Sequence, residues 1–144
     1  MRLFLDTNVL VAAFVEEHEH HTRALPLVNS VHRGAAQGFV SAHSLLEVYA
    51  VLTRLPRTPR LMPLQAATLV QENIVKHFSV LALTAREYGE LIAELGRTGA
   101  FGGQSYDALH LACARKSGAE RILTFNVRHF AELAPELSSK ITAP

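Results

Sequence analysis

Short apolar runs alternate along this chain with longer segments of helical periodicity, and this alternation constrains the fold more than any other feature. The runs at 3–5, 38–41, 79–83 and 121–125 predict strands. Helical patterns are found at 9–15, 22–31, 45–55, 63–76, 85–95 and 106–116. Because such alternation favours parallel strands joined by right-handed crossovers, we predict an α/β fold of three layers. A central, mainly parallel sheet would carry helices on both faces.

The length of the chain and its single cysteine narrow the class of protein further. A chain of 144 residues without an internal linker fits one domain over residues 1–144. Cys113 has no partner for an internal disulfide, which favours a cytoplasmic protein and leaves this residue as a small buried hydrophobe. Asp6 and Asn8 interrupt the N-terminal apolar run, so we expect neither a signal peptide nor a membrane segment.

Asp6 is the first candidate for a functional site because it directly follows the first predicted strand. Ligands of parallel α/β sheets bind beyond the carboxyl ends of the strands, where this carboxylate would lie. The alternative is structural, since Asp6 could cap the following helix or form an Asx turn with Asn8. The residue alone does not separate these two interpretations.

Glu47 lies in an otherwise apolar helical segment, where an acid is expected at the border between core and cleft. The residues Ser44-Leu45-Leu46-Glu47 also match a capping box, in which the glutamate reaches back to the Ser44 amide. The same spacing recurs from Thr84 to Glu87, where we assign only the capping role. For Glu47 both interpretations stay open.

Asp107 begins the most apolar helical segment of the chain, 106–116. A first-turn acid is favoured by the helix dipole, which is its structural explanation. A helix this apolar should pack on the sheet, with its N-terminus at the edge of a cleft. If Asp6, Glu47 and Asp107 share that edge, their repulsion favours a bound cation, and Mg²⁺ or Mn²⁺ prefers such oxygen ligands.

These residues resemble the PIN-domain ribonucleases and, among them, the VapC-type toxins of toxin–antitoxin pairs. The resemblance covers nearly the whole chain and rests on four segments: residues 5–10, 44–54 around Glu47, 106–112 around Asp107, and 123–126 with Phe130. The resemblance implies a PIN-like fold and a magnesium-dependent endoribonuclease that cleaves RNA phosphodiester bonds. It also implies a homodimer and a cognate antitoxin protein as partner.

The same resemblance assigns roles to particular residues. It implies that Asp6, Glu47 and Asp107 form an acidic metal site, supported through hydrogen bonds by Thr7 and Thr124. Asn126 stands where many relatives have a fourth acid, and an amide brings no negative charge, so a second tightly held metal is in doubt. A bound Mg²⁺ would activate a water and neutralise charge on the phosphate oxygens. Asp6 and Asp107 would be its main ligands, and Glu47 would bind through water or activate the attacking water.

The balance of charge is compatible with an RNA substrate once the metal site is considered. The chain has 14 Lys and Arg against 13 Asp and Glu, which excludes a protein that binds nucleic acid by bulk charge alone. With the three site acids set aside, ten acids remain against those 14 basic residues. Arg54, Arg57 and Arg60 form a local basic stripe that could follow an RNA backbone, or simply be a solvated connector.

Several other histidines and glycines are assigned structural roles. His18, His20 and His21 lack the spacing of zinc ligands and are expected in a solvated turn, and His110 is expected as a hydrogen-bonded core residue. Gly102 and Gly103 precede no Gly-Lys-Ser/Thr pattern, so a nucleotide-binding loop is not predicted there.

Two other functions compete with the nuclease. One is a PIN-like module that binds RNA or protein with weak or no catalysis, which a neutral Asn126 and a capping Glu47 would favour. The other is a phosphoryl-transfer enzyme with Asp6 as nucleophile. Such enzymes often carry a second acid two residues on, and this chain has Asn8 there.

Overall fold

The computed structural model describes all residues 1–144 and contains one five-stranded sheet. Its strands are β1 (Arg2–Leu5), β2 (Gln37–Ser41), β3 (Ser79–Leu81), β4 (Arg121–Leu123) and β5 (Ile141–Thr142). They are ordered β3-β2-β1-β4-β5, and every pair is parallel. The predicted α/β class and the parallel sheet are therefore confirmed.

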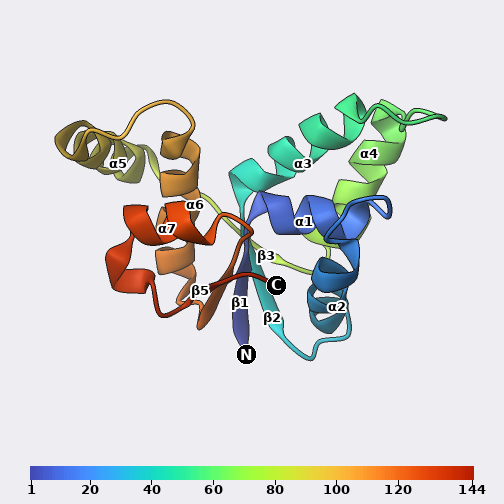
Figure 1. Cartoon of the computed structure of the whole chain (residues 1–144), viewed down its shortest axis with the longest axis horizontal. Coiled ribbons are helices and arrows are strands. Elements are labelled where there is room, and N and C mark those ends of the chain that lie inside the picture. Colours follow the sequence, from blue (N-terminus) through green and yellow to red (C-terminus); the bar gives the residue numbers. More distant parts are fainter.

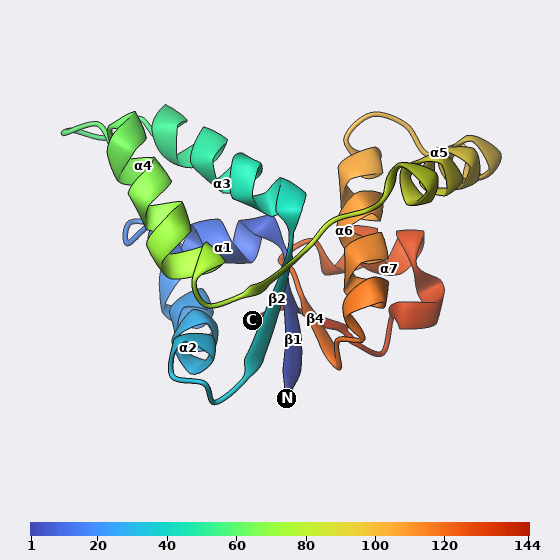
Figure 2. The same ribbon diagram turned by 180° about the vertical axis from the view of Figure 1, so that it is seen from behind.

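Helices cover both faces of the sheet, as Figures 1 and 2 show from opposite sides. On one side lie α1 (Thr7–Phe14), α2 (His21–His32), α3 (Ala42–Arg54) and α4 (Pro63–Val70), which continues into a π-helical turn at Gln71–Val75. On the other lie α5 (Ala85–Thr98), α6 (Gln104–Ser117) and α7 (Val127–Leu133), followed by the short 3-10 helix Pro135–Leu137. No helix of the chain has the length and apolar character needed to cross a bilayer.

The central strand β1 explains why two separate cores form. Successive side chains of a strand point to opposite faces. Leu3 and Leu5 pack into the larger core with α1 to α4, whereas Phe4 packs with Phe39 and the helices α6 and α7. Leu3, Phe4 and Leu5 are all buried, as a strand covered on both faces requires.

The helix and strand boundaries differ from the predictions in a few places. Residues 82–83 and 124–125 lie outside the strands, and the helix predicted over 63–76 is divided at Val70. α1 begins at Thr7 rather than Val9, because Asp6 caps it directly and leaves no separate turn. α7 and β5 were not predicted, since one has a single buried residue, Phe130, and the other only two residues. The capping box from Thr84 to Glu87 is confirmed.

Candidate active site

Asp6 lies at the carboxyl end of β1 and is held from both neighbouring elements. Its Oδ1 accepts a hydrogen bond of 2.7 Å from the Thr7 amide, so Asp6 does cap α1. Its Oδ2 accepts one of 2.7 Å from the Thr124 hydroxyl, which follows β4. The residue is only 4% exposed, yet it lines a cavity. The two sequence interpretations therefore hold together: the carboxylate caps a helix and also faces a possible ligand.

Thr124 connects Asp6 to the loop that carries Asn126. Its hydroxyl oxygen accepts a hydrogen bond of 3.0 Å from the Asn126 amide while it donates to Asp6. Asn8 supports the same loop, because its Oδ1 accepts from the Phe125 amide at 3.2 Å. The amide of Asn8 thus has a structural use where a phosphoryl-transfer enzyme would need an acid.

Glu47 does not cap α3, because the helix begins earlier than the capping-box interpretation requires. Ser41 is the capping residue, and its Oγ accepts from the Ser44 amide at 3.2 Å. Glu47 lies in the second turn, and its Oε1 accepts from the Thr7 hydroxyl at 2.9 Å. The capping alternative for Glu47 is therefore wrong.

His110 is buried as expected, but its ring joins the site instead of only filling the core. Its Nε2 lies 2.7 Å from Glu47 Oε1, and its Nδ1 lies 2.7 Å from the Ser41 hydroxyl. His43 approaches the same carboxylate at 3.9 Å and stacks on Tyr106, with 5.0 Å between the ring centroids. The sequence favoured a satisfied core histidine at this position. The place of His110 one helical turn after Asp107 was the signal for a hydrogen bond near the cleft.

Asp107 is half-buried in the first turn of α6, as predicted. Burial raises the pKa of its carboxyl group, the charges of His110 and His129 oppose this, and the charge of Glu47 raises it further. The charge of Asp107 in turn raises the pKa of Asp6. The three predicted acids are thus close enough to affect one another electrostatically, although Asp107 does not line the cavity that Asp6 and Glu47 share.

The two acids of the cavity differ in how they hold a proton. Burial is the main reason that the pKa of Asp6 is raised to about 6, against the opposing effects of His110 and Thr124. Glu47 is also penalised by burial, but the hydrogen bond and charge of His110 outweigh it and lower the pKa of Glu47. Burial opposes a charge on His110 as well, yet Glu47, Asp6 and Asp107 together raise its pKa. His110 and Glu47 therefore stabilise each other's charged forms.

The cavity has a volume of about 260 Å³. Its lining comprises Asp6, Thr7, Asn8, Val11, His18, Glu47, Val51 and Asn126. Asn126 is thus placed beside the acids, as predicted, and His18 reaches the site from the turn before α2. The basic stripe is elsewhere: Arg57 lies 3.6 Å from Glu17 and lines a neighbouring cavity with His18 and Leu55.

The donor set of this region fits a hard divalent cation. Asp6, Glu47 and Asn126 border one cavity with carboxylate and amide side chains. The charge of Asp107 acts on Asp6, and the charge of Glu47 acts on Asp107. No three His, Cys, Asp or Glu side chains are placed so that they could hold one metal ion together. Magnesium binds through one or two carboxylates and retains several waters, which such a site allows.

Residues 3–135 match the family model described as the PIN domain. The chain is 37% identical over 123 residues to Ribonuclease VapC40 of Mycobacterium tuberculosis. The aligned region covers 85% of each of the two chains. It is 36% identical over 118 residues to Ribonuclease VapC27 of the same species, which covers 82% of this chain and 80% of that protein.

The fold is also found in solved structures of low sequence identity. One is VapC20 of Mycobacterium tuberculosis, described as a Sarcin-Ricin loop cleaving toxin. Its TM-score is 0.67 at 22% identity, and the match covers 90% of this chain and 94% of the VapC20 chain. The VapBC2 complex of Rickettsia felis, bound to a DNA fragment from its promoter, gives 0.64 at 20% identity, with 100% and 99% covered. FitAcB of Neisseria gonorrhoeae gives 0.64 at 15% identity, with 98% and 95% covered.

Proposed function

This chain belongs to the PIN domain family and, within it, to the VapC-type ribonucleases, and from this premise we propose that it is a metal-dependent endoribonuclease and the toxin of a toxin–antitoxin pair. The observation that carries the proposal is Asp6. A buried carboxylate, held by Thr7 and Thr124, faces a cavity that Glu47 also lines. Carboxyl groups with strongly raised pKa values that face a cavity cluster at functional sites.

Asp6 and Glu47, which line one cavity, are the residues that would hold Mg²⁺, and Asp107, which lies outside that cavity, would act on the ion through its charge or through a coordinated water. Mn²⁺ is an alternative of the same ligand preference. When bound, the ion supplies a coordinated water of lowered pKa and neutralises charge on the phosphate oxygens. Asn126 offers a neutral amide beside these acids, so it adds a ligand or a phosphate contact without adding charge. One tightly held ion is therefore the simplest expectation.

The protein's own groups orient the reacting centre. Thr124 and the Thr7 amide fix both oxygens of Asp6, which prevents its carboxylate from rotating. His110 and the Thr7 hydroxyl both bond to Glu47 Oε1, and they leave Oε2 available to accept a proton from water. Because His110 lowers the pKa of Glu47, this carboxylate is deprotonated at neutral pH. Glu47 is thus suited to bind or activate the attacking water.

An antitoxin and a second copy of the chain are the proposed protein partners. Two of the structural neighbours are described as VapBC2 bound to promoter DNA and as FitAB bound to a DNA fragment, which supports an antitoxin partner. Helix α5 supports self-association, since it extends from the body of the molecule (Figure 1) and none of its residues is buried. Ile92 on this helix is 66% exposed. We expect the protein to act in the cytoplasm, where its RNA substrate is found.

A cleavage assay separates the nuclease from a binding module of the same fold. Purified protein is incubated with end-labelled RNA in the presence of Mg²⁺, and in parallel with a chelator. The proposal predicts discrete internal cleavage products with Mg²⁺ and intact RNA with the chelator. Intact RNA in both reactions, despite measurable RNA binding, would favour the binding module. Loss of cleavage on addition of the protein encoded by a neighbouring small reading frame would identify the antitoxin.

A further inference from the structure

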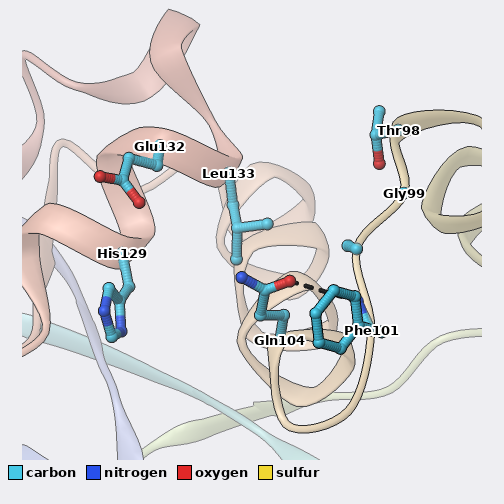
Figure 3. Close-up of a pocket in the computed structure, with 8 residues that line it drawn as sticks. Thr98, Gly99, Phe101, Gln104, His129, Glu132 and Leu133 are labelled. Atoms are coloured by element: carbon cyan, nitrogen blue, oxygen red, sulfur yellow. Dashed lines mark hydrogen bonds between the residues drawn. The ribbon is translucent and has the colours of Figure 1, made fainter.

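A second cavity of about 370 Å³ lies between the loop that precedes α6 and the helix α7 (Figure 3). Phe101 and Gln104 border it from the loop and the first turn of α6, and His129, Glu132 and Leu133 border it from α7. None of these side chains lines the cavity that Asp6 and Glu47 share. The cavity is therefore available for a ligand of its own.

Phe101 gives this cavity an uncovered aromatic face. The residue is 82% exposed, the largest value among the exposed large hydrophobic residues of the chain. Gly99 and Gly102 flank it with φ angles of +77° and +62°, a backbone conformation that favours glycine, and they form the bend that presents the ring. The chain itself leaves this ring uncovered, so a ligand in the cavity can stack on it.

Gln104 adds hydrogen-bond donors of fixed orientation. Its Oε1 accepts a hydrogen bond of 3.2 Å from the Phe101 amide, which leaves the Nε2 group with its two donors for the cavity. Figure 3 shows this nitrogen on the side that faces His129, between the α7 residues and the Phe101 ring. The cavity thus combines an aromatic face with a directed amide donor.

The cavity adjoins the acidic site through two helices. Gln104 lies one helical turn before Asp107 on α6, and His129 lies one turn after Asn126 on α7. A ligand that reaches the acids with one group could therefore place an adjacent group in the second cavity.

We propose that this cavity is a nucleobase subsite, which holds the base of a nucleotide next to the cleaved phosphodiester and thereby contributes to sequence preference. The inference rests on the nuclease function proposed above. Exposed bases of single-stranded RNA stack on aromatic side chains and are recognised by hydrogen bonds along their edges. The Gln104 donors fit the carbonyl oxygens that guanine, uracil and cytosine present, so the subsite takes these bases in preference to adenine, whose acceptors are ring nitrogens alone.

RNA is a better match than an antitoxin peptide for two reasons. Every base has a flat π face, which suits an exposed phenylalanine on a loop that makes few other contacts. The cavity also lies one helical turn from an acid of the proposed nuclease site, because Gln104 and Asp107 share the first turns of α6. A protein occupant is one of the outcomes that the following experiment detects.

Photocrosslinking tests occupancy without requiring cleavage. The Asp6→Asn variant is mixed with a randomised single-stranded RNA pool that contains 5-iodouridine, irradiated, digested and analysed by mass spectrometry. The proposal predicts that the main crosslinked peptide contains Phe101. Crosslinks confined to other segments would overturn the subsite. If RNA crosslinks to Phe101 and the antitoxin abolishes that crosslink, RNA remains the occupant of the cavity. If RNA never crosslinks to Phe101 and the antitoxin protects this residue, the occupant is protein.

Kinetics of matched variants test the energetic role. Phe101→Leu keeps an apolar side chain without the π face, and Phe101→Tyr keeps the ring. We expect Phe101→Leu to raise KM roughly tenfold at nearly unchanged kcat, because one base-stacking interaction is lost. Phe101→Tyr should keep KM near the wild-type value. Gln104→Glu should reduce cleavage beside guanine, uracil and cytosine relative to adenine. An unchanged KM in Phe101→Leu contradicts the subsite even if the enzyme is active.

The two proposals fail in different ways. If wild-type protein cleaves no RNA but Phe101 crosslinks to it, the nuclease proposal is wrong and the subsite stands as an RNA-binding site. If wild-type protein cleaves RNA while Phe101 neither crosslinks nor affects KM, the subsite is wrong and the nuclease stands.

Discussion

His110 on α6 donates a hydrogen bond of 2.7 Å to Glu47 on α3, although 62 residues separate them in the sequence. The same ring lies 2.7 Å from the Ser41 hydroxyl at the end of β2. One buried imidazole therefore connects the acid-bearing helices on the two sides of the sheet. Because α6 also carries Asp107, this connection fixes the relative positions of two of the three acids.

Replacement of His110 should impair both stability and cleavage. His110→Ala leaves the Ser41 hydroxyl and the Glu47 carboxylate without their shared partner, which costs about 1–3 kcal/mol of unfolding free energy. Cleavage should fall because Glu47 regains a higher pKa and loses its fixed orientation. Chemical denaturation and single-turnover cleavage measure the two effects. Cys113→Ala, a buried change on the same helix, is the control; it should lower stability and leave the cleavage rate of folded protein intact.

Thr124 should set the lower pH limit of activity. Its hydroxyl donates to Asp6 Oδ2 and thereby lowers the pKa of that carboxyl group against the effect of burial. Thr124→Val keeps the shape of the side chain but removes the donor, so the acidic limb of the pH–rate profile should move to higher pH. Thr124→Ser retains the hydroxyl and should leave the limb near its wild-type position. Superimposable profiles of Thr124→Val and wild type would show that the bond has no catalytic role.

Asp6 should make the metal-free protein less stable as pH rises through the weakly acidic range. Its pKa is raised from 3.8 to about 6 in the folded state, so between these values the native state binds more protons than the unfolded state. By linkage the free energy of unfolding then falls as pH increases, by on the order of 1–3 kcal/mol in total. Urea titrations in chelator from pH 4 to 7 measure this. Asp6→Asn should flatten the fall; an equal slope in both proteins would assign the effect to other groups.

The basic stripe offers a test of how RNA approaches the site. Replacing Arg54, Arg57 and Arg60 with glutamine should weaken the salt dependence of RNA binding. If all three contact phosphates of a single strand, the slope of the logarithm of the binding constant against the logarithm of salt concentration should become shallower by about 2. Fluorescence anisotropy at several salt concentrations gives this slope. Arg57 already lies 3.6 Å from Glu17, so Glu17→Gln is a useful companion that should strengthen binding. An unchanged slope in the triple variant identifies the stripe as a solvated connector.

The order of the strands along the chain and the class of fold were predictable because polar residues end each apolar run at the sheet edge. Asp6 after β1 and Asp107 at the start of α6 follow directly from that pattern. Glu47 was ambiguous for a physical reason: Ser41 and Ser44 are both good capping residues, and only the end of β2 decides that Ser41 caps α3. The link from Glu47 to His110 joins distant segments, so no local pattern could predict it.

The smallest elements were missed for a related reason. β5 consists of Ile141 and Thr142 alone, and its pairing with β4 depends on the position of the whole sheet. α7 buries only Phe130, which gives no helical periodicity to detect. Its N-terminal neighbour Asn126 and its own His129 nevertheless border the two cavities, so a short, weakly patterned helix contributes to both proposed sites.

The central claim, that Asp6 is the core of a metal-dependent nuclease site, is tested most directly by single-turnover cleavage of labelled RNA by wild type and Asp6→Asn in Mg²⁺. Circular dichroism melting of both proteins confirms that the variant is folded. The account predicts that Asp6→Asn is at least as stable as wild type and cleaves no RNA at any Mg²⁺ concentration. Cleavage by folded Asp6→Asn at the wild-type rate would contradict it.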